Sequence, residues 1–473
     1  MNGEIIRKKI EDRGRYAASC GGDKGQYSCG TKGNVFCLLL SPFISFCLLF
    51  LCSSVVLAQV SGTNSTYSRF GLGVLHDQSQ GFNKSMGGVG LGVRMGNRIN
   101  TMNPASYSSI DSLSLILDVG MSGSFGKMKQ ESQSVKVKNA SLDYVHFGMR
   151  LAKGLGLSVG FVPYSSIDYD FTSPETTIAQ DPNTSQAITC STVYAGSGGL
   201  NQAYIGLGWK AYKDFSIGLN AAFVWGKYEH LLTPIYEVGG TSSSNFSSVI
   251  KNYEASLRTY KLDLGVQYPF RLTQQDRLTL GATVGFGHKI AQDAQLTIYS
   301  YMGDSTSFKA SSPFDLPYTF AFGAAWQHSN TLLVAADMHY ECWGRCRMPV
   351  ETTNAYVPTK GYYKNMAKIA IGTQWTPAPY DKRYWKRVQY RAGFNYTTPY
   401  LMVNGKTGPK EISVTAGAGL PITNRINNRS VVNFGLQWLR RSASGAGMVK
   451  EDYLVINLGM TFNERWFMKY KIE

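Results

Sequence analysis

The sequence predicts an all-β protein, a 14-stranded antiparallel transmembrane β-barrel with an N-terminal Gly-rich plug in its lumen. From Asp111 to Phe462, short segments alternate an apolar residue with a small or polar one, and turn residues separate the segments. An apolar, leader-like run precedes this region, and aromatic residues stand near the segment ends. Alternation gives each strand one apolar and one polar face, and in a transmembrane barrel the apolar face contacts lipid.

The segment 112–124 shows the alternation most clearly. Its apolar face carries Leu113, Leu115, Leu117, Val119 and Met121, and its other face carries Ser114, Ile116, Asp118, Gly120 and Ser122. The same pattern predicts fourteen strands, near 112–126, 142–151, 155–168, 201–210, 215–228, 256–268, 278–289, 317–327, 331–343, 366–375, 387–396, 411–420, 430–440 and 452–462. An even number permits antiparallel closure within a single bacterial chain.

The connections between these strands alternate in length. Short turns are expected at 152–154, 210–214 and 327–330, and long polar loops at 127–139, 170–198, 229–254, 290–315, 344–364 and 441–450. Such barrels have short periplasmic turns and long extracellular loops. Aromatic residues near strand ends predict girdles at the two membrane surfaces. They are Trp209, Trp225, Trp326, Trp343, Trp375, Trp438 and Trp466-Phe467.

Residues 1–58 are expected to be an N-terminal extension and signal peptide. An apolar run from Val35 to Ala58 follows Lys32 and ends in a small residue suited to cleavage, so Gln59 would begin the mature chain. A single anchoring helix is the alternative, and the sequence leaves open whether residues 1–31 are translated in the native protein. The expected domains are therefore 1–58, a plug at 59–110, and the transmembrane barrel at 111–473.

The composition favours a membrane barrel over a nucleic-acid-binding protein. Charged residues make up 16% of the 473 residues, below the roughly 25% of soluble domains. The net charge is +16, and +13 without the expected leader. No basic run has interleaved aromatics that could stack on bases, so anionic lipid headgroups or solutes are the simpler partner.

The sequence predicts no enzyme, cofactor or metal site. None of the six histidines belongs to a motif that ties it to a nucleophile. Cys342 and Cys346 bracket three residues and could close a small disulfide loop in an oxidising compartment. A metal site would need more ligands than this loop offers.

Residues 59–110 do not alternate and are expected to form the plug. Glycines alternate with apolar residues from Met86 to Gly92, and Asn103-Pro104-Ala105 follows. Glycine permits close backbone packing, as a compact segment inside a lumen needs. The residues expected to act as the gate are Phe70, Gly87, Gly88, Gly90, Gly92, Asn103, Pro104 and Ala105.

These motifs resemble the FadL-type family of outer-membrane transporters for long-chain fatty acids and other hydrophobic compounds. The Gly-rich opening and Asn103-Pro104-Ala105 are similar to that family's N-terminal hatch. Two further signatures resemble its later strands: Pro317 and Gly323 with Asp337, Tyr340 and Trp343, and then Arg391, Gly393, Tyr396 and Pro399. The resemblance implies a fourteen-stranded barrel, which agrees with the number of strands expected from alternation.

The resemblance also implies a function: passive passage of hydrophobic molecules, such as long-chain fatty acids, through a plugged barrel in a Gram-negative outer membrane. Asp337, His339 and Glu341 fall on the polar face of their strand and are expected to line the lumen. The expected partners are outer-membrane lipid and a hydrophobic small-molecule ligand, with the chain a monomer. The alternative is a related barrel that docks partners, through its extracellular loops, in a secretion or surface-assembly machinery. The substrate, the direction of transport and the oligomeric state stay open.

Overall fold

The computed structural model describes residues 65–465, apart from residues 132, 181–185, 239–240, 243–248, 301–302, 354, 404, 423–429 and 446. The expected leader, the first residues of the expected plug and Trp466-Phe467 lie outside the described residues. All described residues belong to one structural unit of the chain, Gln59–Glu473.

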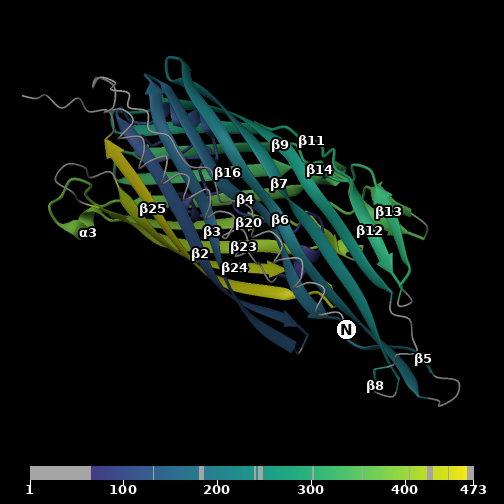
Figure 1. Cartoon of the computed structure of the whole chain (residues 1–473). Helices are drawn as coiled ribbons and strands as arrows, with labels where there is room; N and C mark the ends of the chain where they lie inside the picture. The colour runs from purple at the N-terminus through teal and green to yellow at the C-terminus, as the bar shows by residue number, and fades with distance from the viewer. Residues whose placement is uncertain are drawn as a thin grey trace, which may run out of the picture. The chain divides into compact units, whose positions relative to one another are not determined.

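Fourteen strands of the described chain form a closed antiparallel barrel (Figure 1). In order around the wall they are β2 (Ser114–Gln130), β3 (Gln133–Ala152), β4 (Leu155–Thr172), β6 (Ala187–Tyr212), β7 (Phe215–Val238), β9 (Ile250–Arg271), β10 (Asp276–Gly285), β15 (Thr319–His328), β16 (Leu332–Glu341), β19 (Met366–Trp375), β20 (Gln389–Thr397), β23 (Lys410–Pro421), β24 (Val431–Ser442) and β25 (Lys450–Arg465). The last strand, β25, pairs with β2 and closes the wall. Each of the fourteen expected segments is confirmed as a strand.

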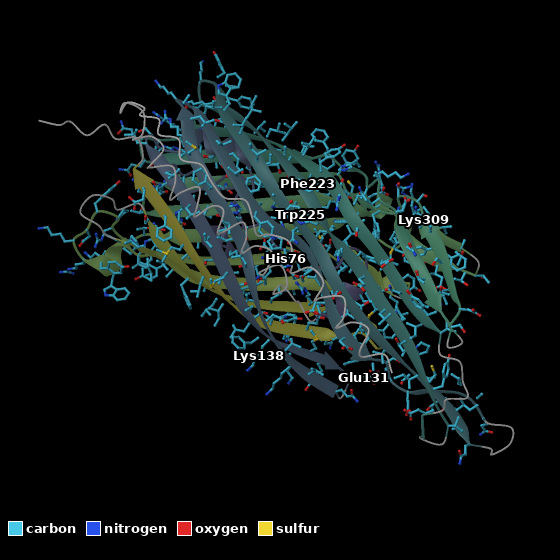
Figure 2. The ribbon with its side chains drawn as sticks, in the orientation of Figure 1. His76, Glu131, Lys138, Phe223, Trp225 and Lys309 are labelled. Carbon is cyan, nitrogen blue, oxygen red and sulfur yellow. The ribbon has the colours of Figure 1, made fainter. Side chains whose placement is uncertain are left out.

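The alternation of side chains separates an outer apolar face from an inner face. In β2, Ile116 and Asp118 are fully buried, whereas Met121 and Phe125 are exposed on the opposite face. In β7, Phe223 is exposed and stacks on Trp225 with 5.6 Å between ring centroids (Figure 2). The expected apolar and polar faces are therefore the outer and inner faces of the wall.

Much of the sequence expected to form long loops instead continues the strands. The β2–β3 ladder runs to Gln130–Gln133, and β6 pairs with β7 as far as Ile188–Val238. The loops expected at 127–139, 170–198 and 229–254 are therefore wrong over most of their length. Their Thr, Val and Tyr residues favour strands, and a continued ladder satisfies the backbone hydrogen bonds.

Short elements complete the described chain outside the wall and the plug. They are β5 (Thr176–Gln180), β8 (Thr241–Ser242), β11 (His288–Lys289), β12 (Ala294–Tyr299), β13 (Ser305–Ala310), β14 (Asp315–Leu316), η5 (Trp343–Arg345), β17 (Met348–Thr352), β18 (Ala355–Thr359), α3 (Tyr384–Arg387), β21 (Met402–Val403) and β22 (Lys406–Thr407). At the rim that carries α3, the connections at 153–154, 213–214 and 329–331 are short, as expected. The longer connection 376–388 contains α3, at the end of the barrel (Figure 1).

No helix in the described part of the chain is long and apolar enough to cross a membrane.

Residues 65–110 form a compact plug against the inner face of the wall. It contains η3 (Thr66–Arg69), β1 (Val74–Leu75), α2 (Gly81–Lys84) and η4 (Pro104–Ser109). The apolar residues between its glycines are fully buried: Phe82, Met86, Val89, Leu91 and Ile99. The plug therefore has an apolar core that it shares with the inner wall, where Phe82, Met86 and Val89 pack with Ala335 and Ala370.

Glycines of the inner wall receive the plug backbone. A Cβ atom at Gly281 of β10 would lie 1.9 Å from the carbonyl oxygen of Leu91. A Cβ atom at Gly393 of β20 would lie 2.1 Å from the backbone nitrogen of Gly87. Only glycine permits such close approach. These inward glycines therefore position the plug.

Candidate gate and lumen cavity

Asn103 fixes the junction between the plug and its last helical turn. Its Oδ1 accepts from the backbone N–H of Ala105 at 3.1 Å, so it caps η4, and Pro104 occupies the first position of that turn. Its Nδ2 donates to the carbonyl oxygens of Leu91 and of Val266 on β9, both at 3.0 Å. Asn103 is fully buried, so one amide joins two plug segments to the wall.

Asp337 of β16 holds the middle of the plug. Its Oδ2 accepts from the backbone N–H groups of Gly90 at 2.5 Å and Leu91 at 2.9 Å. Gly323, across the ladder from Asp337, has no room for a side chain, because a Cβ would lie 2.1 Å from Asp337 Oδ1. Gly323 and Asp337, which both belong to the motif that resembles the FadL-type family, therefore form one contact with the plug.

Gly87 and Gly88 form a turn with positive φ angles of 71° and 81°. Gly87 donates its N–H to Thr415 Oγ1 at 2.8 Å, and its carbonyl accepts from Asn395 Nδ2 at 3.0 Å. A Cβ at Gly92 would lie 2.7 Å from the backbone nitrogen of Ala325. These expected gate glycines therefore lie against the wall.

Phe70 lies apart from these contacts, at the end of η3. It packs against the largest buried apolar cluster, which includes Leu72 of the plug and residues of several wall strands. Arg69 lies over the Tyr194 ring, 3.7 Å from its centroid. The start of the described plug is thus held by aromatic packing.

The plug covers a stretch where β3 and β4 do not pair. Their ladder runs from Ala152–Leu155 to Val145–Phe161 and stops. Beyond that point the plug strand β1 pairs with β4, at Val74–Ser166 and Leu75–Ser165. On the β3 side, Lys84 forms an ion pair with Asp143 at 2.6 Å. We call the unpaired stretch, residues 133–144 of β3 and 162–172 of β4, the seam.

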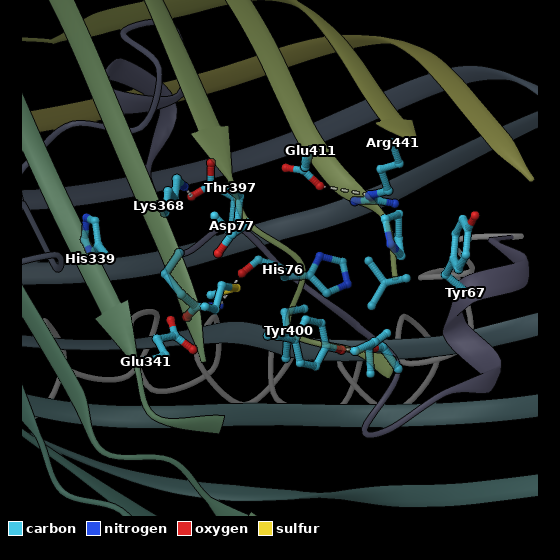
Figure 3. Close-up of a pocket in the computed structure, with 18 of the residues that line it drawn as sticks. Tyr67, His76, Asp77, His339, Glu341, Lys368, Thr397, Tyr400, Glu411 and Arg441 are labelled. Carbon is cyan, nitrogen blue, oxygen red and sulfur yellow. Dashed lines mark hydrogen bonds and ion pairs between the residues drawn. The ribbon is translucent and has the colours of Figure 1, made fainter. Parts of the chain in front are cut away.

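A cavity of about 210 Å³ lies between the plug and the inner wall (Figure 3). Its apolar lining includes Val74, Leu75, Met102, Tyr164, Met366, Tyr400 and Leu401. Its titratable and charged lining residues are His76, Asp77, His339, Glu341, Lys368, Glu411 and Arg441. The cavity is thus amphipathic and bordered by the plug segment that pairs at the seam.

The two cations of the cavity are already paired. Lys368 Nζ lies 3.4 Å from Asp77 Oδ1, and Arg441 Nε lies 2.8 Å from Glu411 Oε2. Arg441 is also 3.8 Å from the buried Glu451, which accepts from Ser65 at the start of the plug. The ion pairs link the plug and four wall strands, β19, β23, β24 and β25, around the cavity.

Two plug groups have displaced pKa values. Burial lowers the pKa of His76 to about 4, so its ring is neutral at neutral pH, and its Nε2 lies 3.1 Å from Ser166 Oγ. Burial alone would raise the pKa of Asp77, but Lys368 and Lys84 outweigh it and lower that pKa. Asp77 is therefore an anion beside a neutral histidine.

The remaining signature residues lie in the wall or next to it. Arg391 is buried, and its Nε and Nη1 donate to Gln374 at 2.9 Å and Asn433 at 2.7 Å. Tyr340 is 39% exposed and faces outward, and its hydroxyl accepts from Asn365. Tyr396, Pro399 and Pro317 are outside the gate contacts: Tyr396 pairs with Ile369 and Ile412 in the wall, Pro399 follows β20, and Pro317 precedes β15.

One expectation near the end of β16 is wrong, and a cysteine pairing that the sequence left open is not formed. Trp343 is not a girdle residue, because the chain turns inward at η5 and Trp343 is fully buried, 5.2 Å from Tyr400 between ring centroids. The disulfide between Cys342 and Cys346 is absent: both are free thiols. The turn at η5 directs Cys346 Sγ to the carbonyl oxygen of Cys342, at 3.9 Å.

Sequence reasoning placed His339 and Glu341 on an inner face but missed most residues around them. Asp77, Lys368, Glu411 and Arg441 around the cavity, and Lys84 at the seam, belong to no local motif. One signal was present: Lys368 and Glu411 occupy inward positions of otherwise apolar, alternating strands. A charge at such a position indicates a lumen contact.

A family model described as BamG matches residues 42–473. The chain belongs to the BamG family. No curated protein matches the chain. The family match covers the whole described plug and barrel.

Solved structures show the fold that this BamG-family chain shares with FadL-type proteins. The Pseudomonas putida toluene transporter TodX is 16% identical, with a TM-score of 0.54, and the match covers 83% of this chain and 100% of that one. A Pseudomonas aeruginosa FadL homologue is 12% identical, with a TM-score of 0.56 and 81% and 98% coverage. The monoaromatic hydrocarbon channel CymD is 14% identical, with a TM-score of 0.52 and 84% and 100% coverage. The predicted FadL-type fold is confirmed.

Proposed function

We propose that this protein is an outer-membrane transporter that gives hydrophobic small molecules passive passage through its plugged barrel. Residues 70–105 would be the gate, and the amphipathic cavity would be the binding site on the route. The chain would act as a monomer, exported by a cleaved leader at 1–58, with outer-membrane lipid around its apolar outer face. Long-chain fatty acids, which the family resemblance implies, fall within this proposed class.

The observation that carries the proposal is the seam beside the cavity. The β3–β4 ladder ends at Val145–Phe161, and beyond it the plug contacts both edges, through the pairing of β1 with β4 and the ion pair of Lys84 with Asp143. Because β3 and β4 do not pair with each other at the seam, these two strands can separate there without breaking any pairing between wall strands. A plug shift would therefore connect the cavity with the seam.

The route follows from ordinary energetics. An apolar molecule entering from the outer rim gains about 0.8 kcal/mol for each CH₂ group that leaves water. The apolar lining around Leu75, Met102 and Leu401 supplies such a surface. Release requires the two β1–β4 residue pairs and the Lys84–Asp143 ion pair to separate. The molecule then leaves beside the plug or through the seam.

The solved neighbours support the same class of cargo. TodX and TbuX are toluene transporters, and CymD is a monoaromatic hydrocarbon channel. A cavity of about 210 Å³ is of a size that suits small ligands. These observations favour compact hydrophobic molecules as the transported compounds. Long-chain fatty acids would be the larger members of the proposed class.

The test is an engineered disulfide that joins the plug to the wall and that can be reduced again. Leu75 and Ser165 face each other across the β1–β4 ladder, so cysteines at both positions have a spacing suited to a disulfide. The variant Leu75→Cys/Ser165→Cys is made with Cys190, Cys342 and Cys346 replaced by serine. Uptake of labelled toluene and of a labelled long-chain fatty acid is measured in Gram-negative cells, before and after reduction.

We expect the oxidised variant to lose uptake and the reduced variant to recover it. A matched staple within the wall, Leu280→Cys/Ala324→Cys between β10 and β15, should have no such effect. Unchanged uptake in the oxidised, locked protein would refute the transport proposal. The two labelled compounds separate a general hydrophobic route from one that carries fatty acids.

A second candidate is a docking subunit of a secretion or surface-assembly machinery. The specific observation that favours it is the length of β6 and β7, which have 26 and 24 residues, although about 9–11 suffice to cross a membrane. The extension carries half-buried strands of mixed polar and apolar residues beyond that length. If a barrel truncated in the β6–β7 extension keeps hydrophobic uptake but loses a co-purifying partner, this candidate is supported.

A further inference from the structure

The cavity has one more carboxylate than it has cations to balance them. Asp77, Glu341 and Glu411 line it, with Lys368 and Arg441. Lys368 pairs with Asp77, and Arg441 pairs with Glu411, as the dashed lines in Figure 3 show. Behind Arg441 stands a further carboxylate, Glu451, at 3.8 Å. An anion that enters therefore meets no cation without an acidic partner.

Glu341 is the carboxylate without a cation among the described residues. Its Oε2 accepts from Trp343 Nε1 at 2.7 Å, and it forms no ion pair with any described residue. Lys261 and Lys368 act on it electrostatically, and each is already ion-paired with an aspartate, Asp263 and Asp77 respectively. In Figure 3, Glu341 lies apart from Arg441, on the Tyr400 side of the cavity.

The cavity lining is also partly apolar, and its Met366 pairs with Glu341 across the β16–β19 ladder. Met366, Tyr400 and Leu401 come from the wall and its connections, and Leu75 and Met102 come from the plug. The cavity of about 210 Å³ therefore has room for a compact apolar body with its head toward Glu341.

We infer that this cavity selects a compact apolar amine in its protonated form, with the ammonium paired to Glu341. The inference rests on the proposed function and names the preferred chemistry of that same site. A carboxylate would approach Glu341 as a like charge and would have to break an existing ion pair. An alcohol of the same chain length would gain the apolar contacts without the ion pair. A protonated amine gains both, because an opposite charge compensates a partly desolvated carboxylate.

The test compares three probes of equal chain length: octylamine, octanol and octanoate. At pH 7.5 the amine is a cation and the acid is an anion. Binding to the full chain in lipid nanodiscs is measured by calorimetry, and empty nanodiscs give the background. We expect octylamine to bind at least tenfold more tightly than octanol, and octanoate to bind most weakly.

The variant Glu341→Gln should remove the preference. Its amide oxygen can still accept from Trp343 Nε1, so the fold is kept, and a heat-dependent shift in gel mobility checks the barrel. Octylamine binding should fall to the level of octanol, while octanol binding stays unchanged. The control Glu229→Gln makes the same change at an exposed residue of β7, away from the cavity lining, and should alter none of the three.

Two results would overturn the inference. Octanoate binding as tightly as octylamine would show that the cavity charge does not select, and so would a Glu341→Gln variant that keeps the preference. Neither result affects the disulfide-lock experiment on transport, which uses neutral toluene. Conversely, a locked barrel that still takes up toluene refutes the transport route, even if the amine preference is observed.

Discussion

Lys84 of the plug and Asp143 of β3 form an ion pair of 2.6 Å at the seam, with side chains only 11% and 7% exposed. Asp143 also accepts from the hydroxyls of Ser122 and Ser141, so its charge is held by three donors. On the other side of the seam, β1 is bonded to β4. The plug is therefore fastened to both edges of the unpaired stretch.

Breaking this pair should loosen the plug. Lys84→Ala leaves Asp143 as a buried anion without its cation, which typically costs about 3–5 kcal/mol. We expect faster uptake of hydrophobic probes and faster protease cleavage within residues 65–110. The double variant Lys84→Ala/Asp143→Ala should recover part of the loss, because no unpaired charge remains.

The control for this prediction is Lys210→Ala. Lys210 pairs with Asp214 at an exposed turn, with side chains 40% and 50% exposed, where an ion pair contributes little. It should leave uptake and cleavage unchanged. If the Lys84→Ala variant and the wild-type protein are cleaved at the same rate, the ion pair of Lys84 with Asp143 does not hold the plug in place.

The fit between plug and wall predicts a large difference between two glycines. At Gly281 an added Cβ would lie 1.9 Å from the Leu91 carbonyl oxygen, so Gly281→Ala must displace plug or wall. Overpacking of this kind costs about 1–3 kcal/mol. Gly123 is the matched control, because its nearest neighbour would be Asn139 O at 4.0 Å. The midpoint temperature of thermal unfolding in detergent should fall for Gly281→Ala and stay unchanged for Gly123→Ala. Equal midpoints for the two variants would contradict the close fit between plug and wall.

The barrel could be predicted from the sequence because period-two alternation is a local signal. Every strand expected from it is present, since each position needs only its neighbours to show which face it occupies. The outer extensions of β6 and β7 were missed for the same reason. There both faces mix polar and apolar residues, so Ser191, Thr192 and Tyr194 give no alternation, although the ladder continues through them.

From the sequence, the type of contact that the plug makes could be predicted, but the pairs of residues that make it could not. Asn103 and the glycines indicated close packing, and Asp337 indicated a lumen position. The pairs themselves depend on closure of the wall: Lys84 and Asp143 are 59 residues apart, and Asp77 and Lys368 are 291 apart. No local pattern links residues at such separations. Trp343 was misplaced because a strand-end tryptophan and a buried tryptophan in the following turn look alike in sequence.

The plug should release more easily as pH falls below neutral. Burial lowers the pKa of docked His76 to about 4, with Asp143, Lys84, Arg441 and Asp77 as its charged neighbours. Released from the wall, the ring would regain an ordinary pKa of about 6.5. The released state then binds more protons between pH 6.5 and 4. The contribution of His76 to docking is therefore fully present above pH 6.5 and is lost as pH falls toward 4.

Protease cleavage of the plug, measured from pH 7.5 to 4.5 with an acid-tolerant protease, checks this. The wild-type rate should rise through that window, and His76→Asn should flatten the profile. Asp77 does not produce the same window, because its lowered pKa places its loss of charge below its ordinary range. Identical profiles for wild type and His76→Asn would assign the pH response to another group.

Asp337 should be needed as an acceptor and not only as a charge. Its Oδ2 accepts from two backbone N–H groups, of Gly90 and Leu91, which lie buried between plug and wall. Asp337→Ala leaves both donors without a partner, at about 1–3 kcal/mol each, whereas Asp337→Asn keeps one oxygen in place. We expect Asp337→Ala to expose residues 86–92 to hydrogen exchange and to raise probe uptake, with Asp337→Asn close to wild type. If the two variants are equally impaired, the negative charge at Asp337 holds the plug, and the acceptor geometry does not.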